Sequence, residues 1–455
     1  MRIDFVLTWK KVALATLAAI FAALAISFSG LISIAASSGH FAVTRWFLGW
    51  TMENAVETQS VLVRIPKDLD LDDPALIQRA AGHFATGCAA CHGGPGVPQS
   101  PVVEEMTPAP PRLEEALGDW SNEELFWIVK HGIKYSGMPA WPTQARDDEV
   151  WAQVAFLRAL PSMDAETYAE LALGGARGQD RLEAGGETTA ALDGIFQNAL
   201  DDCARCHSRD GLGRGEGATE DAFPVIAGQP EPYLFATLQA FAFGIRHSGF
   251  MQPPAKRYDE AMLARLAQWY STQPPAGPAV AGARRQAEQE CLARPSTPLA
   301  TAIPTDQGSD GTESPAVERN EPASAPDVSW QDEAGRLEGD ADVLSFAVPS
   351  AAAAGPPDGR EELLDLGRRI ALEGHPARKV PSCQSCHGTA GREKNSRYPY
   401  LSGQPEWYLA EHLQLFKEDK RGGTEYAHIM AEIAKNLTEE QIDAVAAWYA
   451  EQPLR

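Results

Sequence analysis

Three copies of a Cys-x-x-Cys-His pattern, beginning at residues 88, 203 and 383, carry the chemistry of this chain. Cysteines three positions apart lie on one face of a helical turn, so both sulfurs can reach the two vinyl groups of a single haem. The adjacent histidine is then placed beneath the iron as its proximal ligand. A zinc site or a redox dithiol also uses paired cysteines, but neither accounts for a histidine after all three pairs. Three covalently bound haem c groups are therefore predicted, attached through Cys88, Cys91, Cys203, Cys206, Cys383 and Cys386 and ligated by His92, His207 and His387.

A methionine follows each motif histidine at nearly the same distance, which makes it the predicted sixth iron ligand. These residues are Met138, Met251 and Met430. An isolated methionine usually packs in a core, but three at one offset from haem histidines favour ligation. A methionine opposite a histidine fills both axial positions and raises the reduction potential of the iron. Glycine and proline around Met138, and two prolines after Met251, predict turn-rich loops there.

Other side chains compete for these positions. Met106 lies much closer to its haem motif than the common distance, and Met262 falls on an apolar helical stripe, where packing is the commoner role. After the third haem motif, Met430 is the only methionine. Bis-histidine ligation through His247 or His428 is the remaining alternative.

The segments that position these ligands are predicted to be repeated and helical. After each methionine an aromatic residue and then a proline recur at constant offsets: Phe156, Trp269 and Trp448, then Pro161, Pro274 and Pro453. Matched offsets indicate three copies of one fold. Apolar residues recur at helical spacing over 150–160, 260–273 and 439–452. Because little of the chain alternates with a period of two, an all-α fold is expected.

Local signals mark the ends of two of these helices. Ser121 with Glu124, and Thr438 with Gln441, form predicted capping boxes, in which each side chain binds the backbone amide of the other residue. Gly132 is placed to end the first of these helices.

Composition divides the chain into an anchor, two haem domains, a linker and a third haem domain. In the linker, proline, alanine, serine and acidic residues dominate, and such a stretch cannot bury enough apolar surface to order itself. Cys291, alone in the linker, is predicted to be an inert thiol because no fixed positive charge surrounds it. The predicted segments are a cytoplasmic N-terminus (1–11), a transmembrane anchor (12–36), haem domains at 73–165 and 180–275, the linker (276–358) and a third haem domain (359–455).

The predicted anchor is an uncharged run rich in Ala, Leu, Ile and Phe. About 20 apolar residues span a bilayer, whereas the apolar part of a secretory signal has about 7–15. An uncleaved anchor is therefore preferred over cleavage near Ala35. Basic residues before the run predict a cytoplasmic N-terminus and a periplasmic location for the haem domains. Three aromatic residues after the run are expected either at the membrane interface or against the first domain: Trp46, Phe47 and Trp50.

The net charge of −23 bears on partners. Nucleic acid is disfavoured, because its phosphates require patches of lysine and arginine. The acidic surface fits either docking to a basic redox protein or solubility alone.

These residues together resemble the class I cytochromes c, small all-helical proteins with an N-terminal haem motif and a methionine ligand. The first domain resembles their Gly-Met-Pro variety. The second and third resemble the halves of tandem dihaem cytochromes, because both contain Pro-x-x-x-Gly-Gln-Pro-x-x-Tyr-Leu, beginning at Pro224 and Pro399. The resemblance implies that the carbonyl of this proline orients the haem histidine through its other ring nitrogen. The first domain lacks the motif, and Pro110 or Pro111 is the corresponding candidate.

The motifs, the apolar N-terminal run and the resemblance together predict a membrane-anchored, periplasmic trihaem cytochrome c that carries single electrons in a respiratory chain and is not itself an enzyme. Expected partners are a terminal oxidase, which is favoured, a quinol-oxidising complex or a dehydrogenase. One alternative is a permanent cytochrome subunit of a quinoprotein or flavin dehydrogenase. Another, of a different class, is a peroxidase or gas sensor with one open iron, which a methionine in every domain disfavours. The second and third domains are also expected to pack together as a dihaem pair.

Overall fold

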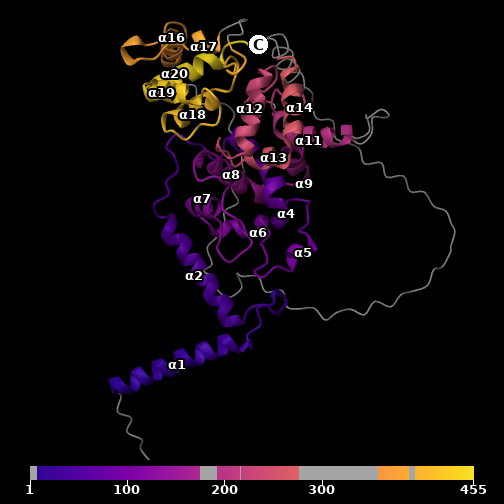
Figure 1. Ribbon diagram of the computed structural model, residues 1–455, viewed down its shortest axis with the longest axis vertical. Coiled ribbons are helices and arrows are strands. Elements are labelled where there is room, and N and C mark those ends of the chain that lie inside the picture. Colours follow the sequence, from indigo (N-terminus) through magenta and orange to yellow (C-terminus); the bar gives the residue numbers. More distant parts are fainter. Residues whose placement is uncertain (1–7, 175–191, 216, 276–356, 389–394, 455) are drawn as a thin grey trace, which may run out of the picture. The chain divides into compact units, whose positions relative to one another are not determined.

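A computed structural model describes residues 8–174, 192–215, 217–275, 357–388 and 395–454. These residues form helices and loops, with no strand and two isolated bridges, Gly94–Val97 and His375–Val380 (Figure 1). The all-α prediction is therefore confirmed. The helices are α1 (Trp9–Ser29), α2 (Ala42–Ser60), α3 (Pro74–His83), α4 (Ala89–His92), α5 (Pro101–Glu104), α6 (Leu113–Ala116), α7 (Asn122–His131), α8 (Asp147–Ala159), α9 (Ala165–Tyr168), α11 (Leu192–His207), α12 (Glu231–Ala242), α13 (Gln252–Arg257), α14 (Glu260–Ser271), α16 (Pro357–Glu373), α17 (Gln384–His387), α18 (Glu406–Lys417), α19 (Ala427–Lys435) and α20 (Glu439–Ala450).

The described residues fall into two compact units. Unit 1 comprises those within 1–209, 235–266 and 422–424, and unit 2 comprises those within 210–234, 267–421 and 425–455. The first predicted haem domain lies in unit 1, nearly all of the third lies in unit 2, and residues of the second belong to both. The boundaries of the three haem domains stay predictions.

Helix α1 is long and apolar enough to cross a membrane. Its 21 residues have a mean hydropathy of 2.2 in their most apolar window, and none is buried. At 1.5 Å per residue the helix is about 31 Å long, which matches a hydrocarbon core of about 30 Å. The helix begins before the predicted run 12–36 and ends earlier, because Gly30 takes the left-handed conformation with φ 68° and terminates it.

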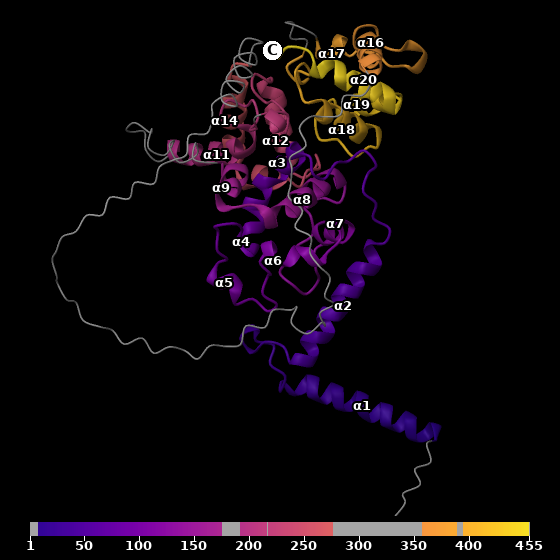
Figure 2. The same ribbon diagram turned by 180° about the vertical axis from the view of Figure 1, so that it is seen from behind.

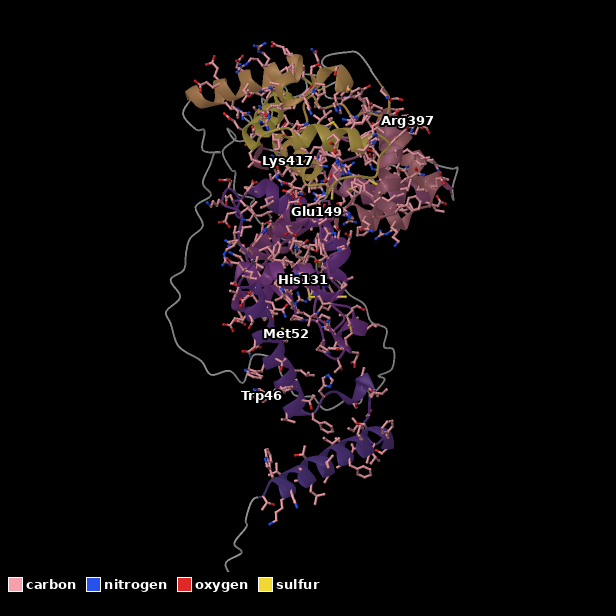
Figure 3. All side chains as sticks on the ribbon, turned by 60° about the vertical axis from the view of Figure 1, so that its left-hand side comes forward. Trp46, Met52, His131, Glu149, Arg397 and Lys417 are labelled. Carbon is pink, nitrogen blue, oxygen red and sulfur yellow. The ribbon has the colours of Figure 1, made fainter. Side chains whose placement is uncertain are left out.

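Helix α2 carries the three aromatic residues on an exposed face. The rings of Trp46 and Trp50 stack with centroids 6.2 Å apart, and Phe47 lies 6.3 Å from Trp50. These side chains belong to residues that are 52–61% exposed, while α2 itself packs against α7. Figure 3 shows Trp46 on this helix. Of the two expected positions, the structure therefore leaves the rings exposed instead of packed against the first domain.

The core of unit 1 forms where α3 packs against α8. Phe84, directly after α3, contacts Phe156 of α8 with ring centroids 5.0 Å apart, and both are fully buried. Helix α7 packs beside them and has the predicted capping box of Ser121 and Glu124 and the predicted end at Gly132. The last helix predicted for the first domain, 150–160, is confirmed as α8, which begins three residues earlier at Asp147.

The core of unit 2 forms where α16 crosses α20, with α18 packed beside them (Figure 2). At Gly367 the two backbones are so close that an added Cβ would overlap the carbonyl of Ala444. Only glycine fits at this position, because any larger residue would push the two helices apart. The capping box of Thr438 and Gln441 begins α20 as predicted. The predicted stretch 260–273 is confirmed as α14, which ends at Ser271.

The segment after Met251 is helical, so the prediction of a loop there is wrong. Helix α13 begins at Gln252, immediately after Met251, with Pro253 and Pro254 in its first turn. Proline is tolerated in the first turn because the amide hydrogens there have no partner within the helix. The linker from 276 to 356, with Cys291, lies outside the described residues.

Candidate haem-binding sites

The first haem motif sits on a short helical turn whose histidine is fixed by the backbone. A π-helical turn, Phe84–Cys88, leads into α4, which ends at His92. The Nδ1 atom of His92 lies 2.8 Å from the carbonyl oxygen of Pro111. Since a carbonyl only accepts, Nδ1 carries the proton, and Nε2 is left to face a metal. Of the two candidate prolines, Pro111 is therefore the partner.

Gln99 closes the loop that follows this motif. Its Nε2 atom donates to the carbonyls of Cys91 and Pro110, each at 2.8 Å. The motif and the segment that orients His92 are therefore tied together by a side chain that the sequence did not single out. Burial lowers the pKa of His92, and the bond to Pro111 partly opposes that shift. A neutral imidazole is the form that ligates iron.

The third haem motif repeats this geometry in unit 2. The Nδ1 atom of His387, at the end of α17, lies 2.9 Å from the carbonyl oxygen of Pro399. The role assigned to Pro399 by resemblance is thereby confirmed. Burial also lowers the pKa of His387, with a smaller contribution from the nearby charge of Arg421. The donor set at both motifs, a neutral histidine with its outer nitrogen oriented by a carbonyl, fits a haem iron.

The motif cysteines fit thioether attachment to haem, because each pair lies three positions apart and a histidine follows it directly. Burial raises the pKa of Cys88, Cys203 and Cys383 to about 12. The motif cysteines, all within the described residues, form no disulfide. In the same part of the chain, no group of three or more His, Cys, Asp or Glu side chains could hold a metal ion.

The second haem motif ends α11 in unit 1. His207 is 8% exposed, and the Sγ atom of Cys206 lies against Gly82 of α3, 2.8 Å from where a Cβ of that glycine would be. Arg205 donates to the carbonyl of Ala172 at 3.3 Å. The motif is therefore packed against the first predicted domain, and the role of Pro224 in orienting His207 stays a prediction.

Met138 and its rival Met106 lie at the same loop. The amide of Met138 donates to the Ser136 hydroxyl at 3.2 Å, and its carbonyl accepts from the amide of Ile133 at 3.3 Å. The methyl group of Met106 lies where a Cβ of Gly137 would be. Both methionines are half-buried, so the structure brings both to one place and the assignment of Met138 stays a prediction.

Met251 lies directly before a helix, and Met430 lies within one. Met251 is the residue before α13, and its amide donates to the Ser248 hydroxyl at 3.0 Å. Met430 lies within α19 and packs against four residues of a small apolar cluster: Phe416, Ala427, Ala431 and Ala434. Both methionines are half-buried, and the rival Met262 lies on α14 as predicted.

The histidines named as alternatives differ in exposure. His428 is exposed in the first turn of α19, and His247 is half-buried before Met251. Bis-histidine ligation stays an alternative for these two. His83, which the sequence did not single out, lies 4.7 Å from the ring of Trp141 and 5.3 Å from that of Phe250. Burial lowers the pKa of His83 to about 4.

Two glutamines of the repeated motif, to which the sequence assigned no role, join the second repeat to the third within unit 2. Nε2 of Gln229 donates to the carbonyl of Tyr400 at 2.9 Å, and its Oε1 accepts from the Tyr400 amide at 2.9 Å. Nε2 of Gln404 donates to the carbonyl of Val225 at 2.7 Å, and its Oε1 accepts from the Val225 amide at 3.1 Å. The repeated Gly-Gln-Pro sequence contained the signal, since each glutamine recurs at the same position.

Comparison with known proteins agrees with this fold. The family model for the cbb3-type cytochrome c oxidase subunit III matches residues 75–157, and the model for cytochrome c matches residues 372–451. Cytochrome c-554(548) of Halomonas halodenitrificans is 35% identical over 74 residues, which are 16% of this chain and 88% of that protein. The chain therefore belongs to the cytochrome c family, and it is an electron carrier with covalently bound haem c.

Three further proteins are similar over longer stretches. The thiosulfate dehydrogenase electron acceptor of Thiomonas intermedia is 25% identical over 252 residues, which are 55% of this chain and 79% of that protein. The crystal structure of reduced cytochrome c4 from Pseudomonas stutzeri covers 57% of this chain and 97% of its own, with 17% identity and a TM-score of 0.35. Cytochrome c4 of Azotobacter vinelandii is 32% identical over 101 residues, which are 22% of this chain and 46% of that protein, and on this similarity the chain resembles the tandem dihaem cytochromes c as well as the single-haem ones.

Proposed function

We propose that this chain is a trihaem cytochrome c that passes single electrons between redox proteins. The observation that carries the proposal is the histidine geometry shared by two separate motifs, His92 with Pro111 and His387 with Pro399, together with a third motif of the same sequence at Cys203. The haem groups supply the redox chemistry when bound. The chain orients the histidines, excludes water and holds the sixth ligands.

In this proposal the proximal ligands are His92, His207 and His387, and the opposite ligands are Met138, Met251 and Met430. A hydrogen bond from Nδ1 to a carbonyl fixes the tautomer and the plane of each ring. Filling both axial positions leaves no iron open to substrate, which favours electron transfer over peroxidase or sensor chemistry.

The proposed location is the inner membrane, with a single span and the haem domains in the periplasm. Helix α1 has the length and hydropathy of a span, and basic residues precede its apolar run. A signal sequence passes the same test of length and composition, so the retention of α1 in the mature protein is part of the proposal. The exposed Trp46, Phe47 and Trp50 of α2 suit the polar edge of a bilayer.

We favour a periplasmic dehydrogenase, which would donate electrons to this chain, as the direct partner. A terminal oxidase, which would accept electrons, is the less favoured direct partner. The relative from Thiomonas intermedia is named for accepting electrons from thiosulfate dehydrogenase. A dehydrogenase that oxidises a small sulfur anion is therefore the first donor to test. A terminal oxidase would be the acceptor further along the chain of carriers.

Haem stoichiometry tests the cofactor part of this proposal. Mature protein should contain three haems that stay attached to the chain through acid–acetone extraction, since a thioether is covalent. Two or fewer haems in fully matured protein would remove one domain from the proposal.

Rapid mixing tests the partner. Oxidised full-length protein should be reduced by a purified thiosulfate dehydrogenase with its substrate, at a rate that saturates with enzyme concentration. No reduction by the dehydrogenase, combined with rapid oxidation of the reduced protein by a terminal oxidase, would favour the respiratory shuttle instead.

A further inference from the structure

Unit 1 contains a buried carboxylate that belongs to no ligand set described above. Glu149, in the first turn of α8, is 3% exposed (Figure 3). Its Oε1 accepts a hydrogen bond from the Ser248 hydroxyl at 2.6 Å, and its Oε2 accepts one from the amide of Gly249. These two residues precede Met251 in the sequence. A side chain of the first predicted haem domain therefore binds the methionine segment of the second.

Arg146 completes the contact. Its guanidinium lies 3.0 Å from Oε1 of Glu149 and donates to the carbonyl of His247 at 3.1 Å. It also donates twice to Asp148, at 2.8 and 2.6 Å. Arg146 is 7% exposed, so both charges are buried, and the pairing offsets the cost of removing them from water. Together the ion pair binds three successive residues, 247–249.

Ser248 transmits this contact to the methionine. Its hydroxyl donates to Glu149 and also accepts from the amide of Met251 at 3.0 Å. Its carbonyl accepts from the amide of Gln252 at 3.1 Å. Because Ser248 is 2% exposed, no water competes for its hydroxyl. The start of α13, and with it the backbone of Met251, is set by the position of the Glu149 carboxylate.

The methionine segment of the first domain meets the same place. Trp141, three residues after Met138, is 6% exposed, and its indole fills the space where a Cβ of Gly249 would be. Its ring lies edge-on to Phe250 at 5.6 Å. The amide of Trp141 donates to the carbonyl of Lys130 at 3.0 Å, which ties this segment to α7. The two methionine segments are therefore packed against each other inside unit 1.

We propose that Glu149 is a positioning residue for Met251, so that the first haem domain holds the sixth ligand of the second haem in place. This inference rests on the proposed ligation by Met251. A carboxylate suits this position because its two oxygens accept separately from the Ser248 hydroxyl and the Gly249 amide, and it also pairs with the guanidinium of Arg146. The electron-transfer properties of the second haem then depend on a domain that does not contain it.

Full-length protein with the Glu149→Ala substitution tests the inference. The substitution leaves the Ser248 hydroxyl and the Gly249 amide without their acceptor, while Arg146 keeps its bonds to Asp148 and to the carbonyl of His247. Met251 should therefore lose its fixed position. We expect the near-infrared sulfur-to-iron band of oxidised protein to lose the contribution of one haem. The same haem should bind carbon monoxide when reduced, and its potential should fall, because methionine ligation raises it.

Milder variants keep the test valid if Glu149→Ala fails to fold. Ser248→Ala removes the hydroxyl that joins Glu149 to the Met251 amide but keeps the bond of Glu149 to the Gly249 amide. It should shift the same haem in the same direction by less. Glu149→Gln retains one accepting oxygen and should restore part of the band. Asp147→Ala, on the same turn of α8 but exposed and paired with Lys130 at the surface, is the matched control and should leave all three haems unchanged.

Met251→Ala separates this inference from the proposed ligation. If Met251→Ala changes one haem and the Glu149 and Ser248 variants leave that haem unchanged, the positioning role is overturned while the ligation stands. If Met251→Ala changes no haem, the ligation itself fails, and the inference fails with it.

Discussion

Gln229 and Gln404 occupy the same position in two repeats, and each binds the backbone of the other repeat. Gln229 binds both polar backbone groups of Tyr400, and Gln404 binds both of Val225. Tyr400 directly follows Pro399, whose carbonyl orients His387. The second repeat therefore binds the segment of the third repeat that orients His387. The third repeat binds the corresponding segment of the second, where Val225 follows Pro224. This reciprocal arrangement provides direct contacts for the expected pairing of the second and third domains.

Gln404→Ala should destabilise unit 2. The substitution leaves the buried amide and carbonyl of Val225 without partners, and an unsatisfied buried polar group costs about 1–3 kcal/mol. Denaturant unfolding followed through the third haem measures the loss. Gln268→Ala, on the exposed face of α14, is the control and should unfold like the unmodified protein. Equal midpoints for the two variants would show that the contact contributes nothing to stability.

The stability of unit 1 should fall as the pH is lowered from 7 to 5. Burial lowers the pKa of His83 from the ordinary 6.5 to about 4, so between these values the unfolded chain binds a proton that the folded chain does not. Stability is then present above pH 6.5 and lost as the pH falls towards 4, with a slope of up to about 1.4 kcal/mol per pH unit.

His83→Phe removes the titrating group and keeps a ring between Trp141 and Phe250, so it should flatten this slope. Denaturant midpoints at pH 7, 6 and 5 measure the effect. Val102→Ala changes an exposed side chain of unit 1 that does not titrate and should keep the slope of the unmodified protein. A slope unchanged by His83→Phe would assign the acid sensitivity to other groups.

Local signals were predictable from the sequence because they act over three or four residues. The capping boxes at Ser121 and Thr438 are examples, since each pairs residues three positions apart. The loop predicted after Met251 failed for a related reason. Proline destabilises the interior of a helix but is tolerated in its first turn. The sequence does not show whether Pro253 and Pro254 interrupt a helix or begin one.

Contacts between distant residues were not predictable. Glu149 binds Ser248 across 99 positions of sequence, and in the sequence it looks like any acidic residue at the start of a helix. Only packing reveals that Asp147 is exposed and Glu149 buried. From the sequence, the carbonyl that orients His92 could be assigned to Pro110 or Pro111 but not to one of them. The two carbonyls are neighbours on one loop, and only the folded backbone shows which of them points at His92.

Electron transfer to or from a basic redox protein should slow as salt is added. A net charge of −23 attracts positive surfaces, and this attraction is screened over about 8–10 Å at 0.10–0.15 M salt. The second-order rate constant, measured by rapid mixing from low to high ionic strength, should therefore fall steadily. A constant rate would mean that the acidic surface serves solubility alone.

The protein should stay with the membrane through a high-salt wash. A membrane-spanning α1 would be held by burial of its apolar side chains in the bilayer, and salt does not weaken such burial as it weakens ionic attachment. N-terminal sequencing of the retained protein should begin at or near Met1. Mature protein that starts near Ala36 and is released with the periplasm would identify α1 as a cleaved signal.

Met430→Ala provides the sharpest test of whether this protein is an electron carrier, with both axial positions of each iron filled, or a catalyst with an open iron. Met430 is the only methionine after the third haem motif, so no second sulfur can replace it. Its loss should open one reduced haem to carbon monoxide and lower the potential of that haem, leaving the other two unchanged. Titration of reduced protein with carbon monoxide and a potentiometric titration measure both effects.

Met430→Leu distinguishes ligation from packing at this position. Leucine has a similar volume and can replace methionine against Phe416, Ala427 and Ala431, usually at a cost below about 1.5 kcal/mol, but it offers no sulfur to iron. If Met430 ligates, both variants should bind carbon monoxide. If Met430 only packs, Met430→Leu should behave like the unmodified protein.

Unmodified protein that already binds carbon monoxide at one haem, or that rapidly turns over peroxide, would favour the sensor or peroxidase alternative, because one iron would then be open.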